Sequence, residues 1–466
     1  MNRFKQVVGL WGIIHLLTVT GAAAQVLSLR QAEEIAIKNY PILKAKGHYV
    51  EASRAAVIQA KRDAYPNWII SAQQDFGTIN GQNGPLYGLG GYGVASSGAA
   101  LPAQNWNAAF GALYLTNINW ELFAFGKARE KIKTASAEAE KTERDLNQER
   151  FQHQVKVAAA YLNLLAAQLI TKSFQQNLAR ADTLQLVVKT KAINGLVAGV
   201  DSSLANAEVS AARIALLRAA DAEVERSAEL ATLMGITEPV AFVLDSQMVS
   251  RIPLSIQDSF LIKENHPELE FYKSRIRVSE ETEKYFGKFQ YPSFSFFSVL
   301  QTRGSGFSNN YPGDLTDFTH GYWEGVRPAR HNYLMGIGMT WNLTTPFRIR
   351  QQVIAQRFIS AGLREELEWA NQRLQTQKQL SESKIQNAVG AFVQAPIQVK
   401  AASDAYLQKS VLYKNGLATI VDVTQSLYAL TRAETDRDIA YSNVWQALLL
   451  KAAVTGDINL FLNELP

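Results

Sequence analysis

The sequence predicts an α+β membrane protein in which each chain combines long α-helical hairpins with four antiparallel transmembrane β-strands. Three observations support this fold class: a start typical of exported proteins, motifs that recur at a nearly constant offset, and an alternation between two kinds of segment. One kind alternates apolar and polar residues with period two, as strands do, and the other runs for more than 60 residues with few helix breakers.

Composition and charge exclude several classes of protein. The 466 residues contain 47 Lys and Arg and 42 Asp and Glu, a net charge of +5, or +3 without Arg3 and Lys5. This balance does not suit a dedicated nucleic-acid binder, so no nucleic-acid partner is expected. The sequence has no cysteine, which excludes disulfides, thiolate metal sites, cysteine nucleophiles and a lipid anchor on a cysteine.

The N-terminus has the pattern of a secretory signal peptide. Arg3 and Lys5 precede a 13-residue, largely apolar run at 7–19, and small residues follow up to Ala24. The apolar run is shorter than the roughly 20 residues of a transmembrane helix. We therefore expect a signal peptide at 1–24 that is cleaved near Ala24. The alternative is a frayed N-terminal helix.

An internal duplication organises the rest of the chain. Short motifs recur after 226 residues and, further along, after 221, and an offset that changes only once indicates a repeat with one insertion or deletion. We predict a first structural repeat at 25–236, a linker at 237–254 and a second repeat at 255–466. The matching motifs are Asn39-Tyr40-Pro41 with Asn265-His266-Pro267, Tyr65-Pro66 with Tyr291-Pro292, Trp120-Glu121-Leu122 with Trp341-Asn342-Leu343, and Asn194-Gly195-Leu196 with Asn415-Gly416-Leu417.

Each repeat is expected to begin with helices. Ser28 and Gln31 have the spacing of a capping box, and the helix that they start must end near Asn39 because Pro41 follows. Second helices are predicted at about 42–65 and 268–291, each followed by a Tyr-Pro motif.

Four strands follow these helices, at about 67–77 and 106–122 in the first repeat and 293–302 and 333–343 in the second. In the last of them Tyr333, Met335 and Ile337 alternate with small or polar residues such as Gly336 and Gly338. The sequence thus predicts strands with one apolar face and one small or polar face. Long linkers, at 78–105 and 303–332, connect the strands of each pair.

Long helical hairpins complete each repeat. Residues 127–193 contain no proline or glycine, and a helix of that length would span about 100 Å at roughly 1.5 Å per residue. Its counterpart is expected at 347–414. Shorter helices return after tips at 194–201 and 415–422, and are predicted at 201–235 and 422–456.

The strands have the length and alternation of outer-membrane strands, but four strands cannot close a barrel. In lipid an open sheet edge leaves backbone groups unsatisfied at a cost of several kcal/mol each, so other copies must complete the barrel. Three copies would provide twelve strands. The alternative is a soluble hairpin packed on helices; the signal peptide and the tryptophans at 68, 106, 120 and 341 favour the membrane interpretation.

These features, in order and in duplicate, resemble the TolC-type outer-membrane efflux protein family over residues 28–456. The resemblance implies a homotrimer with a twelve-stranded β-barrel in the outer membrane and an α-helical barrel that extends into the periplasm. It also implies an exit duct for a tripartite efflux or type I secretion system, with a periplasmic adaptor, an inner-membrane pump and outer-membrane lipid as partners. Many relatives carry an N-terminal lipidated cysteine, which this sequence lacks.

The resemblance places the site at the hairpin tips. It implies a gate or pore entrance formed by Asp201, Tyr413 and Asp422, although Ala418 and Gln425 replace an arginine and an aspartate found in well-known members. The simpler interpretation, compatible with the first, is that Asp201 and Asp422 are N-caps of the returning helices, Asp422 in a capping box with Gln425. The residues expected to dock the adaptor are Asn194, Gly195, Leu196, Val197, Asn415, Gly416 and Leu417.

Catalytic and metal-binding patterns are lacking. The six histidines show neither metal-ligand spacing nor an HExxH motif, so no enzyme, cofactor or metal site is predicted. The alternative function is a periplasmic coiled-coil adaptor or scaffold without a conducting pore, which would have no use for four alternating strands. The sequence does not encode the cargo.

Overall fold

The computed structural model describes residues 26–81, 99–237, 241–246 and 248–465, so the predicted signal peptide and its cleavage near Ala24 lie outside the described residues. The chain forms two compact units. Unit 1 contains Met1–Gly47, Leu146–Glu270 and Trp369–Pro466, and unit 2 contains His48–Asp145 and Phe271–Glu368. Each unit therefore takes segments from both halves of the sequence.

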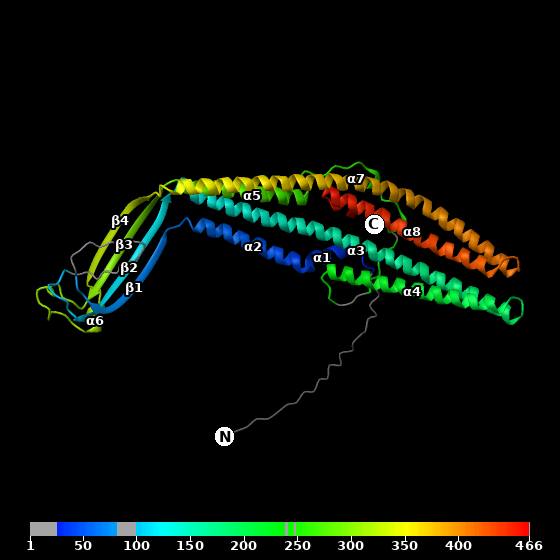
Figure 1. The fold of residues 1–466 in the computed structure, drawn as a ribbon, viewed down its shortest axis with the longest axis horizontal. Coiled ribbons are helices and arrows are strands. Elements are labelled where there is room, and N and C mark those ends of the chain that lie inside the picture. The colour runs from blue at the N-terminus through cyan, green and yellow to red at the C-terminus, as the bar shows by residue number, and fades with distance from the viewer. Residues whose placement is uncertain (1–25, 82–98, 238–240, 247, 466) are drawn as a thin grey trace, which may run out of the picture. The chain divides into compact units, whose positions relative to one another are not determined.

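A four-stranded antiparallel sheet dominates unit 2. The strands lie side by side in chain order, and a short helix, α6 (Tyr322–Val326), separates the last two along the sequence (Figure 1). The four antiparallel strands that the sequence predicts are thus confirmed. Their bounds are β1 (Asn67–Thr78), β2 (Ala108–Phe123), β3 (Ser293–Ser305) and β4 (Arg330–Thr340).

Register and pleat sort the strand residues into two faces. Ile70 pairs with Thr116, Thr116 with Leu300, and Leu300 with Tyr333, so these four residues form one row. The next row, on the opposite face, joins Ser71, Leu115, Gln301 and Asn332. We call these the apolar face and the polar face. The apolar face carries Trp68, Ile70, Ile118, Trp120, Phe296, Met335 and Ile337; the polar face carries Gln73, Asn117, Asn119, Gln301 and Asn332, together with Phe297 and Leu334.

Helices form the rest of both units, and the predicted hairpins are confirmed. In unit 1, α4 returns beside α3 and α8 returns beside α7 (Figure 1). The Ser28 hydroxyl caps α1 in the predicted capping box with Gln31, and Pro41 begins the next helix. The helices are α1 (Leu29–Asn39), α2 (Pro41–Arg62), α3 (Lys127–Ile193), α4 (Gly199–Leu233), α5 (Pro267–Gly287), α7 (Thr345–Lys414), α8 (Ile420–Thr455) and α9 (Asn459–Leu462), with 3-10 turns η1 (Met248–Ser250), η2 (Leu254–Gln257) and η3 (Lys288–Gln290).

The core of unit 1 surrounds α3 and α8, where Tyr161 and Trp445 are fully buried. Both rings keep a hydrogen bond: the Tyr161 hydroxyl donates to the Leu27 carbonyl at 2.8 Å, and the Trp445 indole donates to the Arg251 carbonyl at 3.2 Å. Lys451, only 2% exposed, donates to the Ser255 and Asp258 carbonyls at 2.6 and 2.7 Å. Helix α8 therefore holds residues 251–258, where the linker meets the second half, by directed hydrogen bonds as well as by packing.

The repeated Asn-x-Pro motif has a structural role in both halves. Gly235 follows α4 with φ +68°, and a Cβ there would lie 3.0 Å from the Asn39 backbone. Gly456 caps α8 with φ +77°, and a Cβ there would lie 2.6 Å from the His266 ring. In each half, the end of the returning helix thus packs closely against the Asn-x-Pro turn. Gly235 lies against Asn39 in the first half, and Gly456 lies against His266 in the second.

This contact predicts unequal costs for two glycine substitutions. Gly416→Ala places a Cβ at φ +76° in open space and should cost about 1 kcal/mol of stability through backbone strain alone. Gly456→Ala has the same strain and also collides with His266, so it should cost about 1–3 kcal/mol more. Thermal unfolding followed by circular dichroism measures both. Equal losses would show that the close contact at Gly456 does not matter.

Candidate functional site

The two hairpin tips are built alike. At the first, Gly195 has φ +70° and its N–H donates to the Ala192 carbonyl at 3.1 Å, while the Leu196 N–H reaches back to Lys191 at 2.8 Å. Gly416 and Leu417 repeat this pattern with Tyr413 and Leu412, at 3.1 and 2.8 Å. Both turns are Schellman motifs, which need a left-handed residue and so favour glycine.

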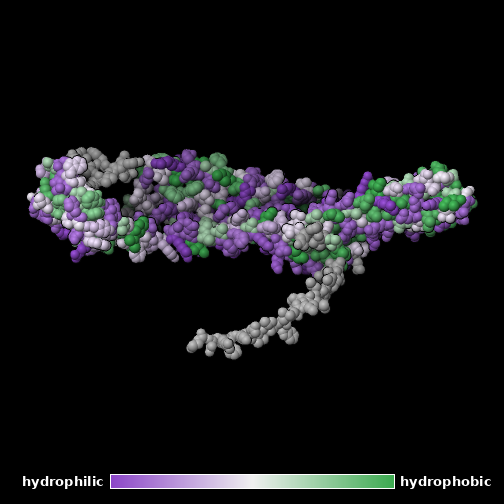
Figure 2. Space-filling model, turned by 90° about the horizontal axis from the view of Figure 1, so that it is seen from below, coloured by the Kyte–Doolittle hydropathy of each residue, from purple (hydrophilic) through white to green (hydrophobic). Residues whose placement is uncertain are grey.

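The tips expose apolar side chains. Leu196 is 71% and Leu417 75% exposed, and Ile193, Val200 and Val421 are exposed beside them. In Figure 2 hydrophobic residues lie among hydrophilic ones at this end of the helical hairpins. Asn194 and Asn415 do not contribute free amides, because each donates from Nδ2 to the carbonyl four residues earlier, at 2.9 and 3.0 Å. The expected docking residues therefore split into exposed leucines and residues that shape the turns.

Lys191 joins the two tips. Its ammonium group donates to the Tyr413 and Lys414 carbonyls at 2.8 and 2.9 Å, and lies 5.0 Å from the centre of the Tyr413 ring. These carbonyls end α7, where the helix dipole is negative and the last carbonyls lack partners within the helix. A lysine of the first hairpin thus caps the long helix of the second.

Asp422 does not begin α8, so the prediction that it is the N-cap, paired with Gln425, is wrong. Thr419 is the N-cap, and Asp422 is the third helical residue of a capping box. Its carboxylate accepts from the Thr419 hydroxyl at 2.7 Å and the Thr419 N–H at 3.0 Å, and Lys409 donates to it at 3.1 Å. The hydrogen bonds from Thr419, followed by Lys409, lower the pKa of Asp422 to about 2.

Asp201 is not an N-cap either. Helix α4 begins at Gly199, two residues earlier than predicted, and its N-cap is Ala198, which has no side-chain oxygen to cap with. As in α8, the aspartate is the third helical residue, where a negative charge suits the helix dipole. Both helices start early because the turn after each glycine is short.

Tyr413 lies in a small core that the two hairpins share, with Leu184, Val188, Ile420 and Val423. Burial, and secondarily the charge of Asp201, raise the pKa of Tyr413. Its hydroxyl has no hydrogen-bond partner among the described residues. The structure thus brings Asp201 and Tyr413 of one chain into the same neighbourhood without a hydrogen bond, and Asp422 is engaged with Lys409 instead.

Sequence reasoning missed Lys191, Lys409 and Thr419. A hydroxyl residue three positions before an aspartate at a helix start is a capping-box signal, so Thr419 was detectable. Lys191 is in the last turn of α3, where a cation is expected to stabilise its own helix end. Its bonds to the other hairpin depend on tertiary packing.

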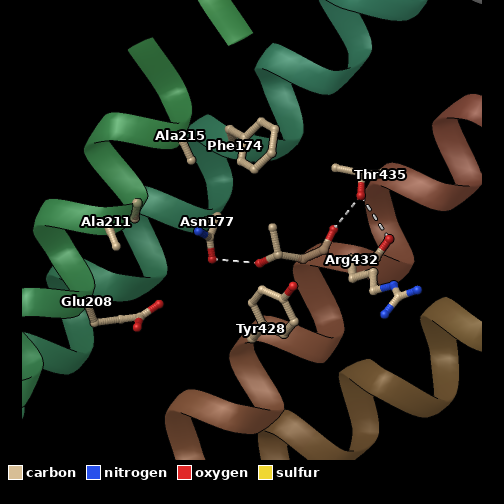
Figure 3. Close-up of a pocket in the computed structure, with 10 residues that line it drawn as sticks. Phe174, Asn177, Glu208, Ala211, Ala215, Tyr428, Arg432 and Thr435 are labelled. Atoms are coloured by element: carbon tan, nitrogen blue, oxygen red, sulfur yellow. Dashed lines mark hydrogen bonds between the residues drawn. The ribbon is translucent and has the colours of Figure 1, made fainter. Parts of the chain in front are cut away.

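Apart from the tips, unit 1 has a pocket of about 360 Å³ between α3, α4 and α8 (Figure 3). The Thr431 hydroxyl donates to the Asn177 side-chain oxygen at 2.7 Å across it. Burial raises the pKa of Glu208, whose side chain also lines the pocket. None of the residues that line the pocket forms a nucleophile–base pair with Glu208. The lining residues are Phe174, Asn177, Glu208, Ala211, Ala212, Ala215, Tyr428, Thr431, Arg432 and Thr435.

Metal-binding groups do not gather at the tips. Within the described ranges, no set of three or more His, Asp or Glu side chains is arranged to hold a metal ion.

Known proteins share this architecture. A family model described as "Outer membrane efflux protein" matches residues 32–236. VceC, an outer membrane protein of Vibrio cholerae, has a TM-score of 0.71 at 16% identity over 92% of this chain and 96% of its own. The Campylobacter jejuni outer membrane channel CmeC scores 0.71 at 13% identity over 92% and 85%. The Neisseria gonorrhoeae outer membrane channel MtrE, solved in an open state, scores 0.69 at 14% identity over 92% and 89%. No curated protein sequence matches the chain.

The link through Lys191 predicts a local effect. Lys191→Met should speed amide hydrogen exchange at residues 411–417 roughly tenfold, because losing a charge-assisted cap costs about 1.4 kcal/mol. Lys189→Met is the matched control, since Lys189 is an exposed lysine of the same helix turn. Exchange rates that are equal in the two variants would mean that Lys191 does not hold the end of α7.

Proposed function

We propose that the chain is a member of the outer membrane efflux protein family, whose model matches residues 32–236, and that three copies of it form the passive exit duct of a tripartite efflux or type I secretion system. It is an outer-membrane channel with the TolC-like fold, and the family consists of transport proteins without enzymatic activity. In the proposed system, cargo enters at the hairpin tips from a periplasmic adaptor and an inner-membrane pump and leaves through the barrel.

The observation that carries the trimer is the open sheet. Strands β1 and β4 each have one neighbour within the chain. Because a lipid-exposed edge is not tolerated, the edge of one copy must pair with that of another. Three four-stranded sheets make a twelve-stranded barrel, within the size range of outer-membrane barrels. In such a barrel the edges of β1 and β4 are paired, the apolar face is turned toward lipid and the polar face is turned toward the lumen.

The exposed apolar face of the sheet favours a channel over the alternative of a periplasmic adaptor or scaffold. A scaffold would be soluble, yet Ile70, Tyr333, Met335 and Ile337 are all exposed on the apolar face. An exposed apolar sheet of this size suits contact with outer-membrane lipid. The absence of cysteine leaves the barrel as the anchor in place of a lipidated cysteine, after removal of a signal peptide near Ala24.

We place the pore entrance and the adaptor-docking surface at the tips. The exposed Leu196 and Leu417, with Val197 beside the first, provide apolar contact for an adaptor. Asp201, Tyr413 and Asp422 are the proposed gate residues. Asp422 pairs with Lys409 of the same chain, and position 418 is an alanine. This supports a gate that is held closed by packing and by bonds within each chain.

The two halves are proposed to be structural repeats, 25–236 and 255–466, joined by 237–254. The matching Schellman turns at Gly195 and Gly416 and the matching helix-end contacts at Gly235 and Gly456 support this division.

The assembly is tested on protein extracted from outer membranes in detergent. Native mass measurement should give a trimer, and the purified protein should conduct ions in a planar bilayer. A monodisperse monomer recovered from the periplasm would overturn the channel and favour the scaffold.

The assignment of the two faces predicts a difference between neighbouring residues. Ile337→Arg places a charge on the apolar face, where Ile337 is 70% exposed, and should cost about 2–4 kcal/mol near the bilayer midplane. Gly338→Arg places it on the polar face, where a new Cβ would lie 3.7 Å from the Phe297 ring, an ordinary contact. The amount of folded protein in the outer membrane measures both. Equal amounts would mean that the faces are assigned wrongly.

A further inference from the structure

Helix α6 lies on the apolar face of the sheet, at the strand ends remote from those that join the helices (Figure 1). Two glycines let it lie this close. A Cβ on Gly304 of β3 would be 2.7 Å from the Gly325 carbonyl oxygen, and a Cβ on Gly325 would be 2.5 Å from the Phe110 Cβ. The alternation of β2 places Phe110 on the same face as Ile118 and Trp120. The helix therefore rests directly on the face that we propose to meet lipid.

Helix α6 also pairs the polar side chains at this end of the face. The Tyr114 hydroxyl donates to the Val326 carbonyl at 3.1 Å, and the Tyr322 hydroxyl donates to the Gln74 side-chain oxygen at 2.8 Å. Polar groups that border hydrocarbon are costly unless they are hydrogen-bonded. In water, solvent would satisfy these groups, so a helix that covers them suits the border of a lipid layer.

A series of aromatic rings leads from the strands to the exposed side of α6. The ring centroids of Phe76 and Phe110 are 4.8 Å apart, those of Phe110 and Tyr322 are 5.2 Å apart, and those of Tyr322 and Trp323 are 5.1 Å apart. Trp323 is 76% exposed. Tyrosine and tryptophan combine an apolar ring with a polar group and are enriched where a membrane meets water. The series thus has the chemistry of a membrane–water interface.

The spacing of the aromatic residues fits the thickness of an outer membrane. Trp120, near the end of β2 that joins the helices, is ten positions from Phe110 on the same face. Ten residues at about 3.4 Å each, tilted by about 40°, span about 26 Å along the membrane normal. The apolar band of outer-membrane barrels is about 25 Å tall, with aromatic residues at both borders. Trp120 and the rings around α6 are therefore spaced like the two borders of that band.

We infer that α6 is an interfacial anchor, with Tyr322 and Trp323 at the level of the lipid headgroups in the outer leaflet of the outer membrane. The inference rests on the proposed function, because only a barrel in the outer membrane turns the apolar face toward lipid. It adds the depth of the barrel in the membrane: hydrocarbon covers the sheet up to the row that Tyr114 occupies, and the headgroups begin at α6.

Lipid suits this surface better than a second copy of the chain. In the proposed trimer, neighbouring copies meet along the edges of β1 and β4. Gly304 and Phe110, on which α6 rests, belong to β3 and β2, the two inner strands. The surface is also continuous with the part of the sheet that is proposed to face lipid, since Leu300 lies on the same face of β3, four positions before Gly304.

Because the sequence has no cysteine, a probe can be placed at a single position. Trp323→Cys is labelled with the fluorophore NBD, and the full-length trimer is reconstituted into phosphatidylcholine vesicles. One set of vesicles carries a nitroxide on the lipid headgroup, and another carries it near the middle of the acyl chain. Nitroxides quench the fluorophore only at short range, so the more effective quencher reports its depth. The probe at Trp323→Cys should lose more of its fluorescence to the headgroup nitroxide.

Tyr333→Cys is the matched control. Tyr333 is 78% exposed on the apolar face, near the middle of the band, so the acyl-chain nitroxide should be the more effective quencher there. Asn332→Cys is adjacent in sequence but on the polar face, and should be quenched less than Tyr333→Cys by both lipids. Glu324→Cys, at an exposed residue of α6, repeats the measurement with Trp323 in place and serves if Trp323→Cys does not assemble.

The possible outcomes are distinguishable. If both nitroxides barely quench the probes on α6 while the Tyr333→Cys probe is quenched, the anchor is overturned and the channel stands. If the acyl-chain nitroxide quenches the probes on α6 more than the headgroup nitroxide does, α6 lies within the hydrocarbon, and the anchor is equally overturned. If neither lipid quenches the Tyr333→Cys probe, the sheet does not face lipid, and the proposed barrel fails together with the anchor.

Discussion

The need to pair every backbone group in lipid governs this molecule. A sheet of four strands satisfies the inner strands β2 and β3 but leaves one edge each on β1 and β4. In water such edges are tolerated, whereas in hydrocarbon each unpaired group costs several kcal/mol. The trimer proposed above would give the edges of β1 and β4 their partners.

Much of the fold follows from local patterns, which is why the sequence predicts it. Period-two alternation identifies the four strands and their faces, and the row from Ile70 to Tyr333 lies on one face as the alternation requires. Ser28, Gln31 and Pro41 define the first helix by short-range chemistry. Helix starts at the tips are predicted less well. The aspartates at 201 and 422 suggest N-caps, but the Schellman turns are completed sooner, and the helices begin at Gly199 and Ile420.

What the sequence could not predict depends on register and on tertiary packing. Alternation places Arg303 and Arg330 on one face, but only the register of β3 with β4 makes them direct neighbours. The tips show the same limit. Lys191 and Tyr413 are 222 positions apart, and their hydrogen bond exists only because two hairpins pack around the core that contains Val188 and Val423.

The tips also show how the loss of one charge pair can be offset by others. With Ala418 in place of an arginine, the second tip lacks the cation that family resemblance leads one to expect there. Two lysines supply positive charge instead: Lys409 pairs with Asp422, and Lys191 binds the carbonyls at the end of α7.

Both contacts lie within one chain, so each stiffens a hairpin or joins two hairpins of the same copy. A contact between copies would have to come from elsewhere on the tips. The buried Tyr413 hydroxyl lacks a hydrogen-bond partner among the described residues and lies close enough to Asp201 to feel its charge, so it is a polar group with unused hydrogen-bonding capacity. Moving α7 and α8 away from α3 would break the Lys191 bonds and expose Tyr413, so the same few interactions hold both hairpins of a chain together.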